Sequence, residues 1–398
     1  MPANPYTVSA QFTVGEDTPH EDTPALAVQR CVEVGMLEDK LIKMTRGCRV
    51  IQAEPSKALC RYLFSSKLAE RRCLNGDART TRDALLPNLA EGVYYDKSIC
   101  KELKDKPELA RKVCDSLCRA SRQAVVRLDA MKGLTDTVTD QVQISHEGDE
   151  LWRVSYGAID HLNIPPKISI CIEGQLLNRL QRMYDRTVKP KQDQQKFLRR
   201  LFCLLMRYQA LGGTDNMVGR HGGGTFHAAS KIFLPEAWAL ITHDLGVTME
   251  CTASPFNSTA PIYWSAFTDT DRFFGSKGNF FDASDTELGK GGSFMADGPP
   301  EEETLDRLEK RIHEVLELTT KLDNPTSFVI GYPAWEDMSC WKNLRNSKYL
   351  VYHVKNCAIV RHLGRLSLFI LQNERGKEQW PVTAVLEARL NSTFGVNA

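Results

Sequence analysis

Apolar side chains recur at intervals of three and four residues between Ala27 and about Met131, with polar residues between them. Leu37, Leu41 and Met44 form one such set. This spacing brings apolar residues to one face of a helix. The pattern therefore predicts a mainly helical structure in this part of the chain.

Segments of a different kind follow before residue 211. Residues 151–156 and 168–172 are short runs rich in apolar and aromatic side chains, which predicts two strands. Residues 175–184 and 194–210 return to the helical period and predict a pair of helices. We therefore expect residues 26–210 to form one mainly helical domain.

Short apolar strands alternate with helices from residue 211 to the end of the chain. The predicted strands are 247–252, 293–295, 327–332, 349–354 and 366–371. The clearest helix between them is 301–321, which has apolar residues on one face and charged residues on the other. This alternation predicts an α/β core with a mostly parallel, doubly wound sheet over residues 211–398.

Composition narrows the class of protein. The 398 residues are 42% hydrophobic and 25% charged, as in globular proteins, and no apolar run is long enough to cross a bilayer. Residues 1–25 are polar and acidic, which predicts a disordered leader and no signal peptide. The twelve cysteines lack the spacing of a zinc site, so we expect free thiols, a reducing intracellular compartment and no metal.

The formal net charge of +1 gives no overall attraction for nucleic acid, but basic residues gather locally. One stripe follows the predicted helix pair and comprises Arg179, Arg182, Arg186, Lys189, Lys191, Lys196, Arg199 and Arg200. Tyr184 and Phe197 are interleaved with it, as on surfaces that follow a phosphate backbone. A solvated helix face is the alternative. A second basic set lies in the helical domain: Arg46, Arg49, Arg61, Lys67, Arg71 and Arg72.

Residue types that are common in binding sites and turns, such as Ser, Asn, Asp, Gly and Pro, concentrate where the predicted strands end. The string E-C-T-A-S-P-F-N occupies residues 250–257, and S-F-M-A-D-G-P-P occupies residues 293–300. Between them lie S-A-F-T-D-T-D at 265–271 and F-G-S-K-G at 274–278. In open α/β sheets, ligands bind beyond the carboxyl ends of the strands, where the strand order reverses. These strings are therefore the candidate site.

These strings, in this order, resemble the phosphorylated-CTD-interacting factor family, the cap-specific adenosine N6-methyltransferases. The later F-V-I-G-Y-P-A-W at 328–335 and L-F-I-L-Q-N at 368–373 are similar to its following core strands. The resemblance implies a class I, Rossmann-like methyltransferase core that uses S-adenosylmethionine. It also implies a substrate, the first transcribed adenosine of capped mRNA, and a nuclear location. By this resemblance, the helical domain is expected to bind RNA or its cap.

The family carries an amino-terminal WW module with two spaced tryptophans. The first tryptophan of this chain is Trp152. We therefore expect the module, and its docking to phosphorylated polymerase tails, to be missing.

The resemblance also implies which residues hold the cofactor. Glu250 is expected at a ribose hydroxyl, with Ser254, Pro255 and Asn257 on the methionine side. Phe274, Gly275 and Ser276 are expected to supply backbone donors and a ring edge. Strand-end turns stabilised by Ser and Asn side chains are the alternative.

The catalytic turn departs from the family pattern. Adenine-N6 methyltransferases carry Asn-Pro-Pro-Phe at this strand end, where the Asn side chain and a backbone carbonyl accept the hydrogens of the amine and the aromatic ring stacks on the base. This chain has Asp297, Gly298, Pro299 and Pro300. Asp297 retains an acceptor, Gly298 fixes the backbone less rigidly, and Pro300 removes the aromatic ring. The alternative is a simple helix start, with Asp297 as its cap.

Two functions follow. The altered turn predicts a non-catalytic member that binds capped RNA or supports an active methyltransferase homologue. The alternative is an active enzyme in which Asp297 orients the amine, Gly298 supplies the carbonyl, and Phe274, Trp335 or Phe256 stacks on the base. A DNA adenine methyltransferase would use the same chemistry, but the sequence strings quoted above resemble the cap-specific family.

The glycine-rich segment 219–229 matches no known nucleotide-binding fingerprint. It is either a contact with cofactor or cap, or a loop that links two domains.

Overall fold

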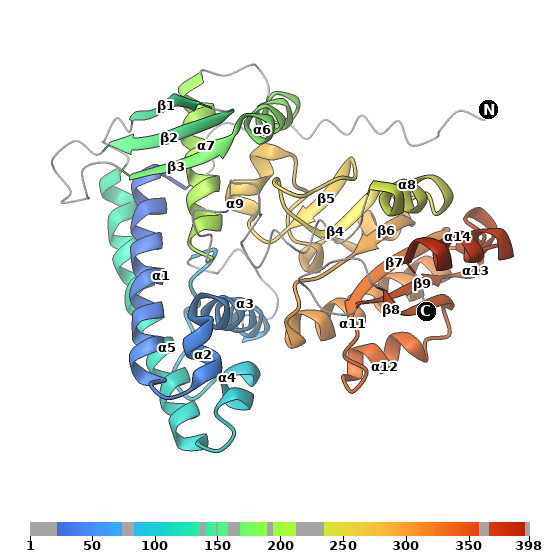
Figure 1. Ribbon diagram of the computed structural model, residues 1–398, viewed down its shortest axis with the longest axis horizontal. Helices are drawn as coiled ribbons and strands as arrows, with labels where there is room; N and C mark the ends of the chain where they lie inside the picture. The colour runs from blue at the N-terminus through green and yellow to red at the C-terminus, as the bar shows by residue number, and fades with distance from the viewer. Residues whose placement is uncertain are drawn as a thin grey trace.

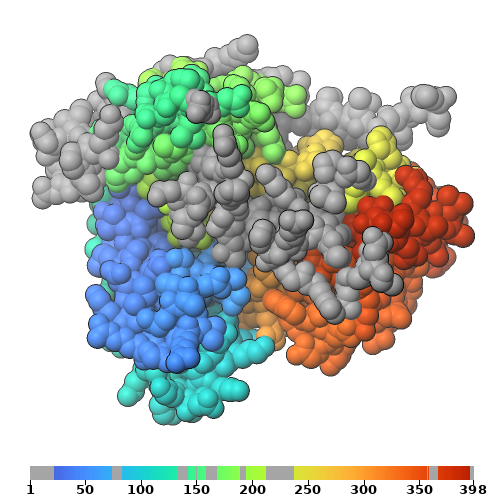
Figure 2. Space-filling view, in the orientation of Figure 1, coloured from blue at the N-terminus to red at the C-terminus, as the bar shows by residue number. Residues whose placement is uncertain are grey.

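The computed structural model describes residues 22–73, 83–135, 141–148, 150–157, 168–188, 194–211, 235–357 and 366–394. An elongated N-terminal part of helices and one small sheet lies beside a C-terminal α/β part built on a larger sheet (Figure 1). In the space-filling view the N-terminal helices, in blue to cyan, and the end of the core, in orange to red, form two masses side by side (Figure 2).

The helical part is built on two long helices that pack along each other, α1 (Pro24–Met44) and α5 (Pro107–Thr135) (Figure 1). Helix α1 begins where Thr23 accepts a hydrogen bond from the backbone N–H of Leu26, and Pro24 occupies the first turn, where its missing N–H costs nothing. Shorter helices complete this part: α2 (Arg49–Ala53), α3 (Pro55–Cys73) and α4 (Lys97–Glu102). The predicted helical structure is confirmed here.

A three-stranded antiparallel sheet interrupts the helices, in the order β1 (Gln141–Gly148), β2 (Leu151–Gly157), β3 (Ile168–Glu173). Strands β2 and β3 were predicted from the sequence, whereas β1 was not. Strand β1 has the sequence Q-V-Q-I-S-H-E-G, in which only Val142 and Ile144 are apolar, so its pattern is weak. The predicted helix pair follows as α6 (Gly174–Thr187) and α7 (Gln194–Gln209).

The core sheet has six strands, in the order β5-β4-β6-β7-β9-β8. They are β4 (Met249–Ala253), β5 (Ile262–Ser265), β6 (Gly292–Ala296), β7 (Thr326–Pro333), β8 (Leu350–Cys357) and β9 (Leu366–Gln372). Strands β5, β4, β6 and β7 are parallel, and β9 runs antiparallel to both β7 and β8. The mostly parallel α/β sheet is confirmed. The short edge strand β5 was not predicted.

Helices cover both faces of this sheet. Alternate strand residues point to opposite faces, so Phe294 packs on α11 (Glu302–Lys321) and α12 (Ser339–Arg345), whereas Met295 packs on α8 (Pro235–Asp244) and α14 (Ala384–Phe394). Strands buried on both faces are apolar throughout, which is why β6, β7 and β9 were readable from the sequence. Shorter helices lie at the sheet ends: α9 (Thr268–Asp271), α10 (Asp285–Leu288) and α13 (Glu374–Gln379).

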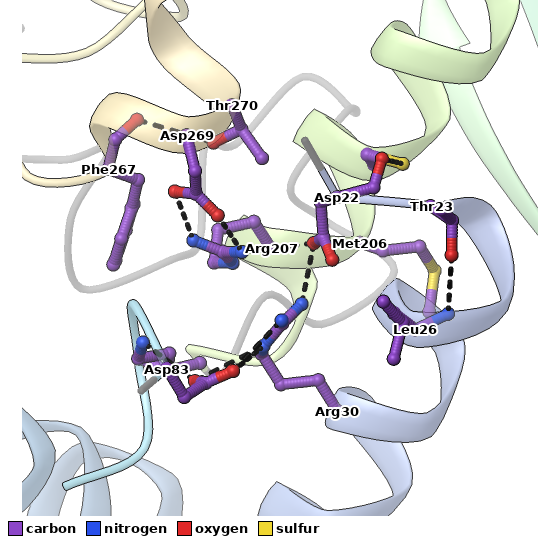
Figure 3. Close-up of polar contacts among 12 residues, drawn as sticks. Asp22, Thr23, Leu26, Arg30, Asp83, Met206, Arg207, Phe267, Asp269 and Thr270 are labelled. Carbon is purple, nitrogen blue, oxygen red and sulfur yellow. Dashed lines mark hydrogen bonds and ion pairs between the residues drawn. The ribbon is translucent and has the colours of Figure 1, made fainter. Parts of the chain in front are cut away.

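A buried ion network joins the helical part to the core (Figure 3). Arg207 of α7 donates to both oxygens of Asp269 in α9, at 2.8 and 2.6 Å, and to Asp22 at 3.0 Å. Arg30 of α1 donates to Asp22 at 2.6 Å and to both oxygens of Asp83, at 3.3 and 3.0 Å. The Arg207 side chain is fully buried. Three carboxylates and two guanidinium groups thus connect four separate segments of the chain.

Helix α3 makes a second junction, against the beginning of α11. Arg71 pairs with Asp282 at 2.9 Å, and Arg72 pairs with Glu303 at 3.3 Å. Lys67, further back on α3, is buried and bonds to Glu70 and to the carbonyl of Asp83. Helix α3 therefore faces the strand ends at which the sequence places the candidate site.

Candidate functional site

The strand order of the core reverses between β4 and β6. The chain passes outward from β4 to β5, then returns to place β6 on the other side of β4. The carboxyl ends of β4 and β6, at Ala253 and Ala296, therefore open at one point of the sheet. This is where ligands bind in open α/β folds.

A cavity of about 100 Å³ lies at this point. We call it the strand-end cavity. Its core wall includes Ser254 and Asn257 after β4, and Asp297 and Pro299 after β6. Its opposite wall comes from α3 and includes Phe64, Lys67 and Arg71. The volume is below the roughly 300–1,000 Å³ of typical small-molecule sites, so a larger ligand requires the α3 side chains to move.

Asp297 is the acidic residue of this cavity wall. It is 9% exposed, and burial, reinforced by the negative charge of Glu250, holds its pKa well above the usual range. Among the residues that the structure describes, no other side chain is recorded as its hydrogen-bond partner. A carboxyl group kept uncharged presents a carbonyl oxygen as acceptor, as the Asn amide of the family turn does.

The remaining residues of the turn point in different directions. Pro299 lines the strand-end cavity, whereas Pro300 lines a separate small hollow with Lys57, Cys60 and Arg61. A Cβ atom on Gly298 would lie 3.0 Å from Leu308 and 3.3 Å from Leu305, so this backbone is packed closely on α11. The turn itself offers no aromatic ring to the cavity.

Helix α11 is capped by Glu301 and not by Asp297. The Glu301 carboxylate accepts hydrogen bonds from the backbone N–H groups of Glu303 and Thr304, at 3.0 and 2.7 Å. The sequence alternative that assigned the cap to Asp297 is therefore wrong. Since another residue satisfies the helix, Asp297 is not needed for this purpose.

The loop after β4 brings part of the predicted cofactor set into the strand-end cavity. Asn257 Oδ1 accepts a hydrogen bond of 2.6 Å from the backbone N–H of Ser254, and Ser254 Oγ accepts one of 3.3 Å from the backbone N–H of Phe256. Both Ser254 and Asn257 line the cavity. Pro255 is buried in the same loop and is not part of the cavity lining.

Glu250 lies near the beginning of β4, at the opposite end from the cavity. Its carboxylate accepts hydrogen bonds from the backbone N–H groups of Thr259 and Ala260 and so fixes the loop between β4 and β5. Burial raises its pKa to about 7, although the two N–H groups act in the opposite direction. The predicted ribose contact of Glu250 has no geometric support, because β4 begins two residues later than expected from the sequence.

The raised pKa of Glu250 predicts a pH-dependent stability. The group favours the folded state fully below about pH 4.5, and this stabilisation is lost as pH rises through about 7. The difference corresponds to about 3 kcal/mol. We expect Glu250→Gln, which keeps the acceptor but cannot ionise, to lose less stability than wild type between pH 5 and pH 8 in urea unfolding. Exposed Glu317→Gln is the control, and equal pH slopes for all three proteins would contradict the assignment.

Phe274, Gly275 and Ser276 lie in a second cleft, beside α6 and away from Asp297. Phe274 is fully buried and packs against Tyr184 of α6, so its ring is not available to a ligand. Gly275 ends a short 3-10 helix with a φ of 97°, a conformation that favours glycine. Ser276 Oγ is 2.7 Å from Ser265 Oγ. Of the predicted cofactor residues, the structure thus places Ser254 and Asn257 in the cavity wall and Phe274, Gly275 and Ser276 in the second cleft, whereas Glu250 and Pro255 line neither.

The predicted RNA stripe is also divided. Arg179 is used inside the protein, where it donates to the carbonyl of Phe256 at 3.1 Å and to the carbonyl and hydroxyl oxygens of Ser258. Arg200 is buried, donates to Tyr184 at 2.9 Å and lies over Phe273. The other described members, Arg182, Arg186, Lys196 and Arg199, are exposed or half-buried. Lys189 and Lys191, like residues 219–229, lie outside the described residues.

In the second basic set, which comprises Arg46, Arg49, Arg61, Lys67, Arg71 and Arg72, several side chains form ion pairs within the protein. Lys67, Arg71 and Arg72 of α3 all form the ion pairs described above. Lys67 and Arg71 also line the strand-end cavity. Arg46 and Arg49 are exposed, and Arg61 is half-buried beside Pro300.

The aromatic residues in the cavity wall are not those named from the sequence. Phe64, Tyr208, Phe267, Phe280 and Phe281 line the cavity. Phe256 instead packs edge-on against Tyr208, and Trp335 is 38% exposed in the turn after β7. Phe267 belongs to the quoted S-A-F string, so its position after β5 was a usable signal. Phe64 is more than 200 residues from Asp297 along the chain, and no local pattern connects them.

In the part of the chain that the structure describes, no helix is both long and apolar enough to cross a membrane.

Comparison with known proteins shows which family part of this chain resembles. Residues 179–362 match the family model described as the phosphorylated CTD interacting factor 1 WW domain. A human protein named mRNA (2'-O-methyladenosine-N(6)-)-methyltransferase is 36% identical over 144 residues, and its mouse counterpart is 35% identical over the same length. These 144 residues are 36% of this chain and 18% of either relative, so the match spans about a fifth of the relatives' length.

The family match runs from within α6 to just beyond β8 and therefore includes the loops after β4 and β6. The relatives are methyltransferases by name, and the mixed α/β sheet with its strand-end cavity is a Rossmann-like methyltransferase core. Through residues 179–362, a little under half of its length, this chain is similar to the phosphorylated-CTD-interacting factor family.

Proposed function

We propose that this chain is a non-catalytic member of its family that binds capped RNA or supports an active methyltransferase homologue. The observation that carries the proposal is the turn after β6. Pro300 stands where the family has an aromatic residue, and it faces the hollow beside Arg61 and not the strand-end cavity. The base of a bound adenosine therefore loses its stacking partner from the turn.

The size of this loss is considerable. Stacking of a base on an aromatic ring contributes about 1–3 kcal/mol. Gly298 adds a further loss, since its carbonyl is held by a residue with more backbone freedom than proline. A deficit of a few kcal/mol in the transition state lowers the rate by roughly 10²-fold or more.

An active enzyme is the second candidate, and the position of Asp297 favours it. Asp297 lies in the cavity wall, burial holds its pKa well above the usual range, and its carboxyl oxygen can accept a hydrogen bond from an exocyclic amine. Tyr208, Phe267, Phe280 and Phe281 could replace the missing ring, since all four line the same cavity. In this case Asp297 and the Gly298 carbonyl would orient the amine.

S-adenosylmethionine is the cofactor that this family implies, and it would supply the methyl group. Ser254 and Asn257 are the polar residues at the carboxyl end of β4 that fit its amino-acid portion, because both already line the cavity. The cavity volume of about 100 Å³ fits only part of the cofactor as it stands. That this chain still binds S-adenosylmethionine is therefore part of the proposal. So are the nuclear location, RNA as partner and independence from metal.

The test combines calorimetric titration and a methyl-transfer assay on the full chain. The protein is titrated with S-adenosylmethionine and with a short m7G-capped RNA that begins with adenosine. We expect the RNA to bind and no methyl group to be transferred. Asp297→Ala should then leave RNA affinity within about twofold of wild type, as should the control Asp105→Ala, which changes an exposed residue of the helical part.

Two results would contradict the proposal. Methyl transfer that Asp297→Ala abolishes and Asp105→Ala preserves would establish the active enzyme. No binding of capped RNA, together with no complex with an active homologue, would remove both non-catalytic roles.

A further inference from the structure

A cleft of about 640 Å³ lies between α6 and the edge of the core sheet. We call it the α6 cleft. One wall is α6, from Arg179 to Thr187. The other wall is formed by residues 258–263, which lead into the edge strand β5, and by residues 272–277, which follow α9. None of these residues lines the strand-end cavity.

The lining of the α6 cleft is strongly basic. Five lining residues are Arg179, Arg182, Arg186, Arg272 and Lys277, and the described lining contains no Asp or Glu. Arg182 and Arg186 lie one turn apart on α6, and both are exposed. The nearby carboxyl of Glu250 is bound to backbone N–H groups, and its raised pKa lowers its negative charge near neutral pH. A cleft lined by cationic side chains and by no acidic residue attracts anions.

The cleft does not present aromatic faces. Tyr263 is 3% exposed and donates its hydroxyl to the carbonyl of Phe274 at 2.8 Å, and Phe274 is fully buried. Single-stranded nucleic acid binds through phosphate contacts and through bases stacked on aromatic rings. Since only the first kind of contact is available here, the cleft suits phosphate groups and offers no platform for bases.

One loop separates the α6 cleft from the strand-end cavity. Ser254 and Asn257 face the cavity, while Ser258, Thr259 and Ala260 face the cleft. Arg179 holds this loop from the cleft side through its hydrogen bonds to residues 256 and 258, as described above. A polynucleotide with one nucleotide at the cavity would therefore follow this loop, from the carboxyl end of β4 back to the beginning of β5, to reach the cleft.

We propose that the α6 cleft binds backbone phosphates of the RNA that extends from the nucleotide at the strand-end cavity, and that it does so without reading the bases. Arg182 and Arg186 are the principal contacts, whereas Arg179 is a positioning residue for the loop. The inference rests on the proposed binding of RNA. It adds the location of the nucleotides beyond the one at the strand-end cavity, which we call the body of the RNA, and the arginine–phosphate contacts that bind them.

The experiment measures anisotropy of a labelled single-stranded RNA of about ten nucleotides on the full chain, over a range of salt concentrations. The test variant is Arg182→Gln/Arg186→Gln. The matched control is Arg111→Gln/Lys112→Gln, which removes two exposed basic side chains at the beginning of α5. Each lost phosphate contact reduces the slope of log K against log salt by about 0.7 for a single strand.

We expect the test variant to lose about 1.4 units of slope and to bind roughly tenfold or more weakly at about 50 mM salt. The loss should be equal for RNAs of different sequence, and the control should behave as wild type. Equal slopes for the test variant, the control and wild type would overturn the proposal. So would a loss confined to one RNA sequence, because that result indicates base recognition.

Two further arms separate this inference from the proposed function. An m7G-capped adenosine dinucleotide lacks the body of the RNA, so the test variant should bind it as wild type does. Weakened binding of this dinucleotide would contradict the assigned place of the cleft. If the wild-type protein binds no RNA in any form, the proposed RNA function itself fails. If it binds RNA and the test variant loses no slope, only the cleft assignment fails.

Discussion

Arg207→Met is expected to lower the free energy of unfolding by about 3–5 kcal/mol, because it leaves buried carboxylates without their partner. Arg207 is fully buried and bonds to both oxygens of Asp269 and to Asp22. Without it, Asp269 has no recorded cation among its described partners, and Asp22 keeps only Arg30. The measurement is the shift in urea unfolding followed by circular dichroism.

A surface pair of the same kind provides the control. Arg119 on α5 donates to both oxygens of Glu91, at 3.0 and 2.6 Å, but its side chain is 56% exposed. Arg119→Met should lower the free energy of unfolding far less than Arg207→Met, because water screens this exposed pair. The double variant Arg207→Met/Asp269→Leu should recover part of the loss, since it removes both charges together. Equal losses for Arg207→Met and Arg119→Met would show that the buried network does not hold the two parts together.

Restoring the family turn should raise the rate of methyl transfer far above that of the wild type. In the triple variant Asp297→Asn/Gly298→Pro/Pro300→Phe, the acceptor, the fixed carbonyl and the aromatic ring are all returned. We expect a rate at least about 10²-fold above that of the wild type, matching the deficit assigned to the turn. The measurement is single-turnover transfer to a capped RNA that begins with adenosine.

The packing around the turn permits the change. A Cβ at residue 298 meets only the side-chain ends of Leu305 and Leu308, which can adjust by a few tenths of an ångström. The phenyl ring that Pro300→Phe introduces would arise in the hollow beside Phe64, which lines both the hollow and the cavity, so the ring stacks on a base only by turning past Phe64 into the cavity. The control is Asp297→Asn/Gly298→Pro without the aromatic ring, for which we expect less than a tenth of the gain. A triple variant that binds cofactor and RNA but transfers nothing would show that the turn is not the cause.

The sequence predicted the α/β core well because its strands are buried on both faces. Strands β6, β7 and β9 are continuous apolar runs between helices. Such runs can be predicted from the sequence without knowing which strands pair with them. Strand β5 has only four residues and follows a proline-containing loop, so its pattern was too short to recognise. Strand β1 is mostly polar and depends on pairing with β2 for its conformation.

The sequence predicted only those site residues that directly follow a strand in the chain. Ser254, Asn257 and Asp297 each follow a strand, and the rule of strand ends brings them together. The wall from α3 was not predictable, because Phe64 and Lys67 reach the cavity through tertiary packing alone. The burial of basic residues of α6 and α7 inside the protein was hidden for the same reason. A basic residue on an amphipathic helix has the same sequence signature whether it meets solvent, a carbonyl or a phosphate.

The ion network of Asp22, Arg30, Asp83, Arg207 and Asp269 also constrains the order in which the chain can acquire its structure during synthesis. Asp22 leaves the ribosome 185 residues ahead of Arg207, and Asp269 follows Arg207 by a further 62. Until that last segment emerges, the helical part has a guanidinium group whose main partner does not yet exist. The N-terminal half therefore lacks the stabilisation of this contact until residue 269 has been synthesised, although it is translated first. Cutting the chain near residue 210 would separate Arg207 from Asp269. One fragment would then carry the guanidinium group and the other the carboxylate, each without this partner.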